Sequence, residues 1–173
     1  MPGFWRQLCL RMHSTAKRLA AIALGSNLAS EWGDREANLR EAIRRVGRLG
    51  EMRAVSSFHD TAPVGITEQP RFLNAAMLLE TELEPVELMR ALLAVERAMG
   101  RDRTAVAAKG PRIIDLDLLL MEDVVLVTGE LTLPHPAMAE RRFVLAPLAE
   151  IAPDWVEPLS GQTVAQLLAA LAG

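Results

Sequence analysis

Two aspartates separated by one residue carry the clearest chemical signal in the sequence. Asp115 and Asp117 lie within an apolar segment, residues 113–121, that predicts a β-strand. Alternate side chains of a strand point to the same face, so the two carboxylates should stand side by side, about 7 Å apart along the strand. Like charges in this position repel one another unless a cation or a basic group lies between them. Mg²⁺ suits such a site because it prefers one or two carboxylates together with phosphate oxygens and water. The opposite face of the strand should pack in the core through Ile114, Leu116, Leu118 and Leu120.

The alternative to a metal site is a solvated strand face on which an arginine neutralises the pair. Aspartate is depleted in strands, which weakens that alternative. Four basic residues precede the aspartates, most of them in a segment without apolar periodicity: Arg101, Arg103, Lys109 and Arg112. Such a group fits a polyphosphate clamp, because guanidinium groups bind phosphate through paired hydrogen bonds. A solvated basic loop is the other interpretation, and charge alone does not decide between the two.

A histidine between two prolines is the next candidate. His135 is flanked by Pro134 and Pro136 and is followed by Arg141 and Arg142. The prolines stiffen the local backbone, so the imidazole either binds a phosphate or serves as a structural turn residue. The residues alone favour the structural role slightly.

Four further residues have types that suit a ligand. Phe72 and Asn74 share one face of a predicted strand, and an aromatic ring beside a carboxamide suits a flat, hydrogen-bonding heterocycle. Phenylalanine, including Phe143, belongs more often to a core than to a ligand platform. Glu96 lies on the flank of the apolar face of a predicted helix, where it is either solvated or in reach of a ligand.

The elements that must position these residues alternate between strands and helices. Strands are predicted at residues 19–24, 52–58, 72–83 and 113–121, and a hairpin at residues 124–127 and 131–133. Helices are predicted from residue 36 to Gly50, from Pro85 to Gly100 and at residues 163–171. A loop occupies residues 61–71, and a short helix or turn at residues 137–148 leads into a last strand. This order predicts an α+β domain that resembles the ferredoxin-like arrangement.

Length, charge and cysteine content restrict the class of protein. The chain has 173 residues, which predicts one domain over residues 19–173 after an N-terminal extension of residues 1–18. The formal net charge of −3 argues against a general nucleic-acid binder. No apolar run reaches the ~18 residues of a membrane span, and the single cysteine, Cys9, allows no disulfide within the chain. We expect a cytoplasmic, monomeric protein that binds neither nucleic acid nor a membrane.

The first eighteen residues are basic and partly apolar. Their basic residues are Arg6, Arg11, Lys17 and Arg18, and the first acidic residue of the chain is Glu31. This pattern is typical of an organelle transit peptide. The alternatives are a disordered extension, which we expect, or translation that begins at Met12.

Several segments follow one another in a specific order and spacing. They are Ala23-Leu24-Gly25-Ser26-Asn27-Leu28, Val55-Ser56-Ser57, Gln69-Pro70 with Phe72-Leu73-Asn74-Ala75, Gly110-Pro111-Arg112-Ile113-Ile114-Asp115-Leu116-Asp117, and Leu133-Pro134-His135. Together they resemble the 6-hydroxymethyl-7,8-dihydropterin pyrophosphokinase family from residue 19 to residue 153. The Gly-Pro-Arg-x-x-Asp-x-Asp element is the most specific of them. The chain contains no Gly-x-x-x-x-Gly-Lys-Ser/Thr motif, so it is not a P-loop enzyme.

The resemblance implies a ferredoxin-like α+β core with long mobile catalytic loops and an Mg²⁺-dependent enzyme with ATP as co-substrate. In the implied reaction the hydroxymethyl oxygen of 6-hydroxymethyl-7,8-dihydropterin attacks the β-phosphorus of ATP and AMP leaves, a step of folate biosynthesis. Two Mg²⁺ ions are implied between the triphosphate and the pair Asp115 and Asp117. Catalysis of this kind is mainly positioning and electrostatics. Asp115 and a metal-bound water are the two candidates for the general base.

The resemblance also assigns residue roles. Arg101 and Arg112 match arginines that grip the ATP phosphates, and with the two aspartates they form the implied catalytic set. The other implied nucleotide-binding residues are Glu96, Leu118, Thr132, His135 and Arg141. The implied pterin site places Phe72 and Phe143 on the two faces of the ring, and its other residues are Thr61, Ala62, Val64, Asn74 and Asp115. The resemblance thus replaces the structural interpretation of His135 and the core interpretation of both phenylalanines.

The chain departs from some relatives in the loop between Arg101 and Arg112. Thr104 stands where some relatives carry a lysine, Ala108-Lys109 where some carry a tryptophan, and Pro136 where others carry a tyrosine. Two alternatives to an active enzyme follow: a non-catalytic ferredoxin-like binding module, and a family member that has lost its activity. An enzyme requires Mg²⁺ and releases AMP, whereas a module binds its ligand without turnover.

Overall fold

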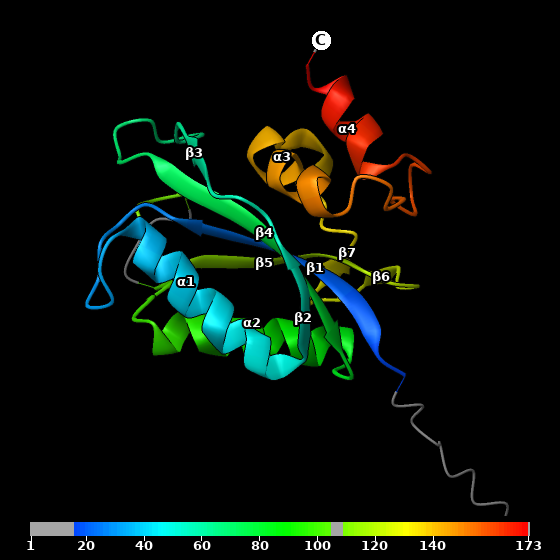
Figure 1. Cartoon of the computed structure of the whole chain (residues 1–173), viewed down its shortest axis with the longest axis horizontal. Coiled ribbons are helices and arrows are strands. Elements are labelled where there is room, and N and C mark those ends of the chain that lie inside the picture. The colour runs from blue at the N-terminus through cyan, green and yellow to red at the C-terminus, as the bar shows by residue number, and fades with distance from the viewer. Residues whose placement is uncertain (1–15, 105–108, 173) are drawn as a thin grey trace, which may run out of the picture.

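Five strands form one antiparallel sheet across the middle of the molecule (Figure 1). The computed structural model describes residues 16–104 and 109–172. β1 (Arg18–Ser26) lies between β4 (Phe72–Thr81) and β5 (Asp115–Met121). β2 (Glu51–Val55) and β3 (His59–Thr61) follow one another along the other edge of β4. The predicted α+β class is confirmed. Most of the predicted N-terminal extension, with Cys9, lies outside the described residues, and Arg18 at its end already belongs to β1.

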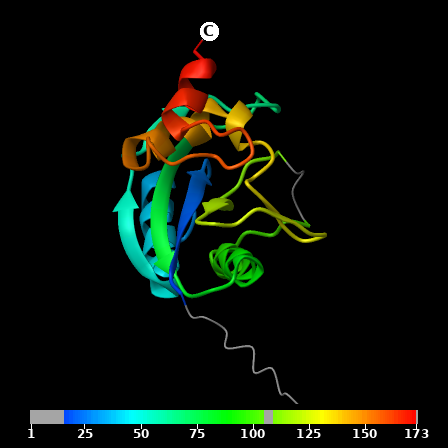
Figure 2. The same cartoon turned by 90° about the vertical axis from the view of Figure 1, so that its right-hand side faces the viewer.

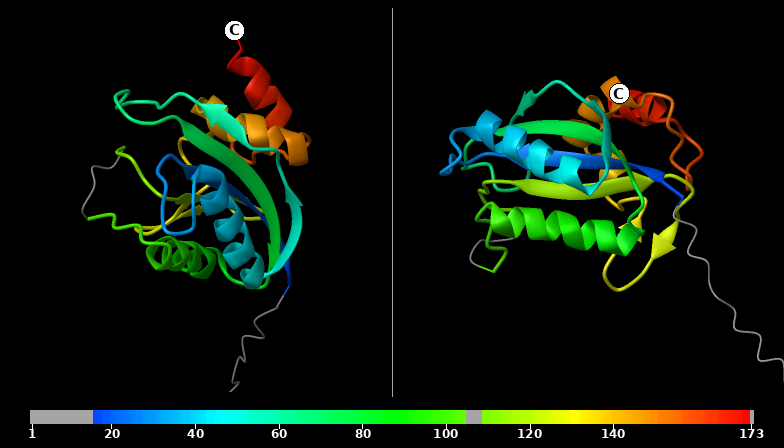
Figure 3. Two further views of the ribbon diagram at one scale, coloured as in Figure 1. Left: turned by 60° about the vertical axis from the view of Figure 1, so that its left-hand side comes forward. Right: turned by 60° about the horizontal axis from the view of Figure 1, so that its bottom comes forward.

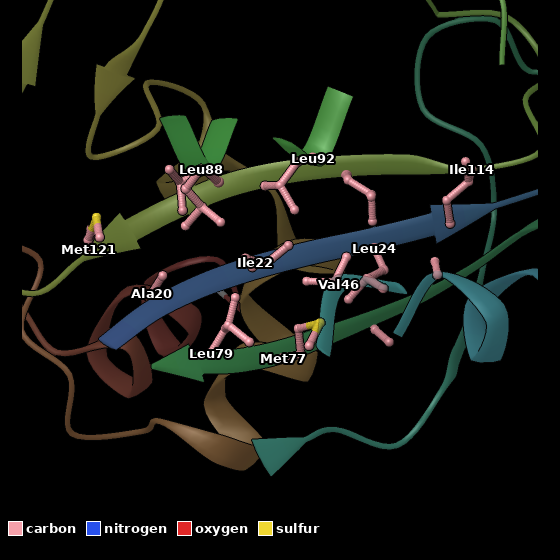
Figure 4. Packing of buried hydrophobic residues seen from close by; sticks show 14 of the residues in the cluster. Ala20, Ile22, Leu24, Val46, Met77, Leu79, Leu88, Leu92, Ile114 and Met121 are labelled. Atoms are coloured by element: carbon pink, nitrogen blue, oxygen red, sulfur yellow. The ribbon is translucent and has the colours of Figure 1, made fainter. Parts of the chain in front are cut away.

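Helices cover both faces of the sheet. α1 (Arg35–Val46) and α2 (Pro85–Ala98) lie on one face, and α3 (Arg142–Ile151) and α4 (Val164–Ala170) lie on the other (Figures 1 and 3). The core beneath α1 and α2 is aliphatic and fully buried, and its members include Ala20, Ile22, Leu24, Met77, Leu79, Leu88 and Leu92 (Figure 4). A smaller core under α3 and α4 contains Ala21, Ala76, Leu120, Val144, Leu145 and Leu148. Within residues 16–104 and 109–172, no helix has both the length and the hydropathy to cross a membrane.

The sequence explains where the two long helices begin and end. The Asp34 side chain accepts a hydrogen bond from the backbone N–H of Ala37 and caps the start of α1. Glu84 and Glu87 form a capping box at the start of α2, with Pro85 as its first residue. α1 continues as one 3₁₀ turn, η1 (Gly47–Leu49), and the predicted ends at Gly50 and Gly100 are confirmed.

A β-bulge in β5 changes which side chains face which core. The pairing with β1 shifts from Leu118 opposite Ile22 to Leu120 opposite Ala21, so Leu119 is an extra residue. An inserted residue reverses the alternation of the side chains beyond it. Leu120 therefore packs under α3 and α4, and its predicted position on the face of Leu116 and Leu118 is wrong. The bulge lies after both aspartates, so their shared face is unaffected.

Two other predicted strands differ from the structure. The strand predicted at residues 52–58 is divided into β2 and β3, because the Ser56 hydroxyl accepts the hydrogen bond of the Ala76 N–H in place of a backbone carbonyl. The strand predicted after residue 148 is absent from the described part of the chain, where α3 runs on to Ile151. A turn follows in which the Glu157 carboxylate accepts hydrogen bonds from two backbone N–H groups, those of Leu159 and Ser160. The predicted hairpin is confirmed as β6 (Leu126–Val127) and β7 (Thr132–Leu133), and η2 (Met138–Glu140) follows it.

Two neighbouring glycines should respond in opposite ways to substitution by alanine. A Cβ at Gly50 would lie 2.2 Å from the backbone oxygen of Glu80, so the backbone would have to move. We expect Gly50→Ala to lower the free energy of unfolding by about 1–3 kcal/mol. Gly47 has helical φ and ψ of −59° and −15° and open space around it, so Gly47→Ala should raise stability by about 0.4–1 kcal/mol. Urea unfolding measures both, and a Gly50→Ala variant as stable as the wild type would contradict the packing at Gly50.

Candidate active site

The floor of the candidate site is a row of residues across three strands. Gly25 of β1 pairs with Asn74 of β4 on one side and with Asp115 of β5 on the other. In the next row along β1, Ala23 lies beside Asp117. A Cβ at Gly25 would lie 3.0 Å from the Asn74 Oδ1 atom and 4.0 Å from the Asp115 Cβ atom. The small residues of β1 therefore leave room above the sheet between an amide and two carboxylates.

A pocket opens over this floor, on the face of the sheet that α3 covers further along. It contains about 530 Å³ of space when the mouth that is open to solvent is counted. The turn after β1, the loop after β3 and the segment before β5 meet at this end of the sheet (Figure 1). The lining includes Arg112 and Asp117. It also includes all seven residues predicted for the pterin site, which are Thr61, Ala62, Val64, Phe72, Asn74, Asp115 and Phe143.

Each of the two predicted stacking rings has a guanidinium group over its face. The Arg112 guanidinium carbon lies 5.2 Å from the centre of the Phe72 ring, and that of Arg141 lies 5.9 Å from the centre of the Phe143 ring. Phe72 begins β4, whereas Phe143 lies in the first turn of α3, so two distant segments supply the pair. Cation–π contacts of this kind contribute about 0.5–1 kcal/mol at exposed sites.

The two aspartates have different surroundings. Asp115 accepts a hydrogen bond from Arg101, and its Oδ2 atom lies 3.6 Å from the Nη1 atom of Arg112. Burial raises the pKa of the Asp117 carboxyl, the charge of Asp115 raises it further, and the positive fields of His135 and Arg141 act in the opposite direction. A divalent cation between the carboxylates would remove their repulsion, and the donor set of two carboxylates fits Mg²⁺ with phosphate oxygens. In the described residues, no group of three or more His, Cys, Asp or Glu side chains could hold a metal by itself.

A buried glutamate holds the arginines beside Asp115. Glu96 of α2 is 1% exposed, and its carboxylate accepts hydrogen bonds from Arg101 at 2.8 Å, from Arg103 at 2.9 Å and from the Leu116 backbone N–H at 2.7 Å. Burial raises the pKa of Glu96, although these donors favour its ionised form. The geometry places Glu96 beneath the arginines. Its role as a direct ATP contact stays a prediction.

The other residues predicted to bind the nucleotide differ in how deeply they are buried. The Nδ1 atom of His135 accepts a hydrogen bond from the Ala137 backbone N–H at 3.2 Å, so a neutral imidazole carries its proton on Nε2, where it can donate. Leu118 is only 4% exposed and points into the core beneath the sheet, so only its backbone could meet a nucleotide. Thr132 is half-buried in β7. Part of the predicted phosphate-binding loop, residues 105–108, lies outside the described residues.

Comparison with known proteins assigns the family. The family model described as 7,8-dihydro-6-hydroxymethylpterin-pyrophosphokinase matches residues 21–153. The chain belongs to this family. A Methylorubrum extorquens protein named 2-amino-4-hydroxy-6-hydroxymethyldihydropteridine pyrophosphokinase is 43% identical over 154 residues, which cover 88% of this chain and 92% of the relative. A Bacillus subtilis protein of the same name is 44% identical over 135 residues, 77% of each chain.

Other proteins that match this chain are longer than it is. The Folic acid synthesis protein fol1 of Schizosaccharomyces pombe is 36% identical over 95% of this chain, which spans only 22% of that protein. The crystal structure of Plasmodium falciparum HPPK-DHPS matches with a TM-score of 0.70 at 13% identity, over 89% of this chain and 45% of that one. This structural match shows a shared fold.

Two family-motif residues without a predicted role form a junction beside Arg112, which lines the pocket. Asn27 is 2% exposed; its amide donates to the Gln69 side chain at 2.9 Å and accepts from the Arg112 backbone N–H at 2.8 Å. Gln69 also donates to the Lys109 carbonyl at 3.0 Å. The loop of residues 61–71 is thereby tied to the segment that carries Arg112. Their presence in the motifs was the only signal in the sequence, because the contacts join segments distant along the chain.

Removal of the Glu96 carboxylate should destabilise the fold. Glu96→Ala would leave Arg101, whose side chain is 11% exposed, without its buried partner. Breaking a buried ion pair costs about 3–5 kcal/mol, and we expect a loss of that order in urea unfolding. Glu82→Ala, at an exposed glutamate in the turn before α2, serves as control and should change stability by no more than about 0.5 kcal/mol. Equal effects of the two substitutions would contradict the anchoring role of Glu96.

Proposed function

We propose that this chain transfers the diphosphate of ATP to the hydroxymethyl group of 6-hydroxymethyl-7,8-dihydropterin and releases AMP, as a step of folate biosynthesis. One observation carries the proposal: a single pocket contains all seven residues predicted for the pterin beside the Asp115–Asp117 pair. The family match over residues 21–153 and the bacterial relatives named as the pyrophosphokinase support the reaction type.

In the proposed complex the pterin ring lies between Phe72 and Phe143, above Gly25. The Asn74 amide donates to the Thr61 hydroxyl at 2.6 Å, which fixes its orientation, and its Oδ1 atom faces the space over Gly25. An acceptor held there can accept hydrogen bonds from the N–H groups along the edge of a flat heterocycle. The absence of a Cβ at Gly25 lets the ring edge approach the sheet closely.

Arg101, Arg112 and His135 would bind the phosphates, and Asp115 and Asp117 would hold Mg²⁺, two ions by the family pattern. When bound, the metal supplies charge neutralisation and aligns the reacting oxygens. Arg101 is held in place before the substrate arrives, since the carboxylates of Glu96 and Asp115 both accept hydrogen bonds from its Nη1 atom. Donors fixed in this way lower the barrier because they need no reorganisation during the reaction. Arg141, beside Phe143, is the further proposed phosphate contact, and Thr132 and the backbone of Leu118 are proposed to meet the nucleotide.

We also propose a ferredoxin-like core for residues 19–173, preceded by an N-terminal extension, in a cytoplasmic monomer. The element order β1-α1-β2-β4-α2-β5 and the sheet order β2-β4-β1-β5 support this core, because two βαβ-type halves then share one sheet.

AMP formation tests the proposed reaction. The purified chain is mixed with ATP, Mg²⁺ and 6-hydroxymethyl-7,8-dihydropterin, and AMP is followed with and without the pterin and after chelation of the metal. We expect AMP only when the pterin and Mg²⁺ are both present. Folded protein that binds ATP and the pterin without releasing AMP would favour the binding module or the inactive family member instead.

The Asp117 carboxylate should be essential for turnover. Asp117→Ala should leave the fold intact and lower kcat by about 1,000-fold or more, because the metal stabilises the transition state by several kcal/mol. Asp154→Ala, at an exposed turn residue, is the matched control and should retain the wild-type rate. Near-normal turnover of Asp117→Ala would overturn the metal assignment.

Loss of the Phe143 ring should affect the two substrates differently. Phe143→Ala removes one stacking face, and stacking on an aromatic side chain is worth about 1–3 kcal/mol per base in comparable sites. We therefore expect a pterin Kd about 5–150-fold higher and an ATP Kd within about threefold of wild type. Trp32→Ala is the control, because Trp32 also carries a guanidinium, that of Arg45 at 4.9 Å, but is not among the residues that line the pocket. Equal weakening of both ligands by Phe143→Ala would contradict the stacking role.

A further inference from the structure

A second polar cluster lies outside the pocket, where the end of α3 meets the segment between β2 and β3. The Glu150 carboxylate accepts hydrogen bonds from the Ser57 hydroxyl at 2.7 Å and from the Ser57 backbone N–H at 2.8 Å. It also binds the Nε2 atom of His59. The Ser57 hydroxyl and backbone N–H hold the pKa of Glu150 below its usual value, with a further contribution from His59. One carboxylate thus gathers three donors from another element.

The residue types are those of a hydrolytic triad, but the geometry is different. In a triad the serine hydroxyl donates to the imidazole. Here the Ser57 hydroxyl donates to Glu150, and the His59 Nε2 atom also faces that carboxylate, which requires a proton on Nε2. This nitrogen has no lone pair to offer the hydroxyl 3.3 Å away. The cluster is therefore a junction between two elements and not a nucleophilic site.

The cluster joins α3 and β3, and both elements contribute residues that line the pocket. Glu150 lies seven residues, two helical turns, after Phe143, so the two side chains share one side of α3. His59 lies two residues before Thr61, with which it shares one face of β3. Thr61 lines the pocket directly and receives the hydrogen bond of Asn74.

The two elements differ in how firmly they are held. α3 is fixed to the sheet through Val144, Leu145 and Leu148, which are buried in the smaller core. β3 has three residues and pairs only with β4 in the described sheet. The charged groups that hold β3 from its other face are those around Asp60, which accepts hydrogen bonds from Arg35 and Arg71. Glu150 supplies a polar link from β3 and the residues before it to the helix.

We propose that Glu150 is a positioning residue of the pterin site, which holds Ser57 and His59 against α3 and thereby sets the gap between Thr61 and the Phe143 ring. This inference rests on the proposed function, in which that gap receives the pterin. A wider gap prevents the ring from stacking on Phe143 while its edge meets Asn74, so affinity for the pterin falls. Among the proposed phosphate contacts, Arg101, Arg112 and His135 lie on other elements. Arg141 lies at the start of α3, which the smaller core holds in place without Glu150, so affinity for ATP should not depend on Glu150.

Glu150→Gln in the full chain tests this role, because it removes the charge and presents an amide N–H₂ to the donors while it keeps the side-chain size. Dissociation constants are measured separately for 6-hydroxymethyl-7,8-dihydropterin and for ATP with Mg²⁺. Loss of two or three charge-assisted hydrogen bonds at a site beside the pocket should raise the pterin Kd about 5–10-fold and leave the ATP Kd within about twofold. Glu82→Gln, the same change in an exposed turn at the far end of β4, should alter neither constant.

A second variant tests whether the residues act as one unit. Ser57→Ala removes the hydroxyl and retains the backbone N–H bond, so it should raise the pterin Kd by about threefold. Adding Ser57→Ala to Glu150→Gln should raise it no further, since both changes break the same junction.

The proposal is overturned if folded Glu150→Gln binds the pterin as wild type does, if both ligands weaken equally, or if the two changes are additive. Should Glu150→Gln not fold, wild-type pterin affinity in Ser57→Ala would overturn the proposal. A wild-type chain that binds the pterin without forming AMP would overturn the proposed reaction alone. A wild-type chain that does not bind the pterin would overturn both.

Discussion

The register of β1 between its two neighbours is the constraint on which the site depends. Because Gly25 pairs with both Asn74 and Asp115, an amide acceptor and a carboxylate stand on either side of a residue without a side chain. A slip of one residue in either pairing would turn a whole set of side chains to the other face of the sheet. The buried aliphatic residues beneath the sheet oppose such a slip, since Ile22 and Leu24 would then leave the core (Figure 4). The core under α1 and α2 therefore fixes the geometry of the pocket on the opposite face.

The same arrangement requires an unusual concentration of charge at one end of the sheet. Two carboxylates of β5 lie on one face with the arginines of the neighbouring segments around them, and Glu96 holds two of those arginines from below. Burial of a carboxylate costs free energy even when it is paired, and the raised pKa of Glu96 reflects this cost. Replacement of a whole buried ion pair by apolar residues of similar volume is often neutral or stabilising, so stability alone does not explain the group. Its presence beneath Arg101 is explained by the need to hold that guanidinium beside Asp115.

Local sequence features were sufficient for most elements and for part of the site. The capped helices, the apolar strands and the shared face of Asp115 and Asp117 follow from periodicity and from cap residues such as Asp34 and Pro85. The bulge at Leu119 was not predictable, because it depends on the pairing of β5 with β1 and not on a local signal. The Asn27–Gln69 junction was missed because it joins segments far apart along the chain. The buried position of Glu96 was missed because it depends on the packing of α2 against β5, where the Leu116 N–H donates to its carboxylate. Figure 2 shows the helices and the sheet from a second side. Only the resemblance to the family could assign the pocket residues to one pterin site, since Phe72 and Phe143 have no common local pattern.

Arg112 links the two halves of the proposed reaction. Its guanidinium lies over Phe72, the ring proposed to stack on the pterin, and also 3.6 Å from Asp115, beside the proposed phosphate site. A pterin ring on the face of Phe72 that the guanidinium covers would displace it, and stacking of about 1–3 kcal/mol is of the same order as the contact that is lost, about 2 kcal/mol for a largely buried guanidinium. The displaced guanidinium keeps its charge and its paired donors, and phosphate oxygens are the strongest acceptors that the reaction brings to this end of the sheet. Under the proposed function, filling the pterin site therefore releases an arginine for the phosphates, while Asn27 holds its backbone in place.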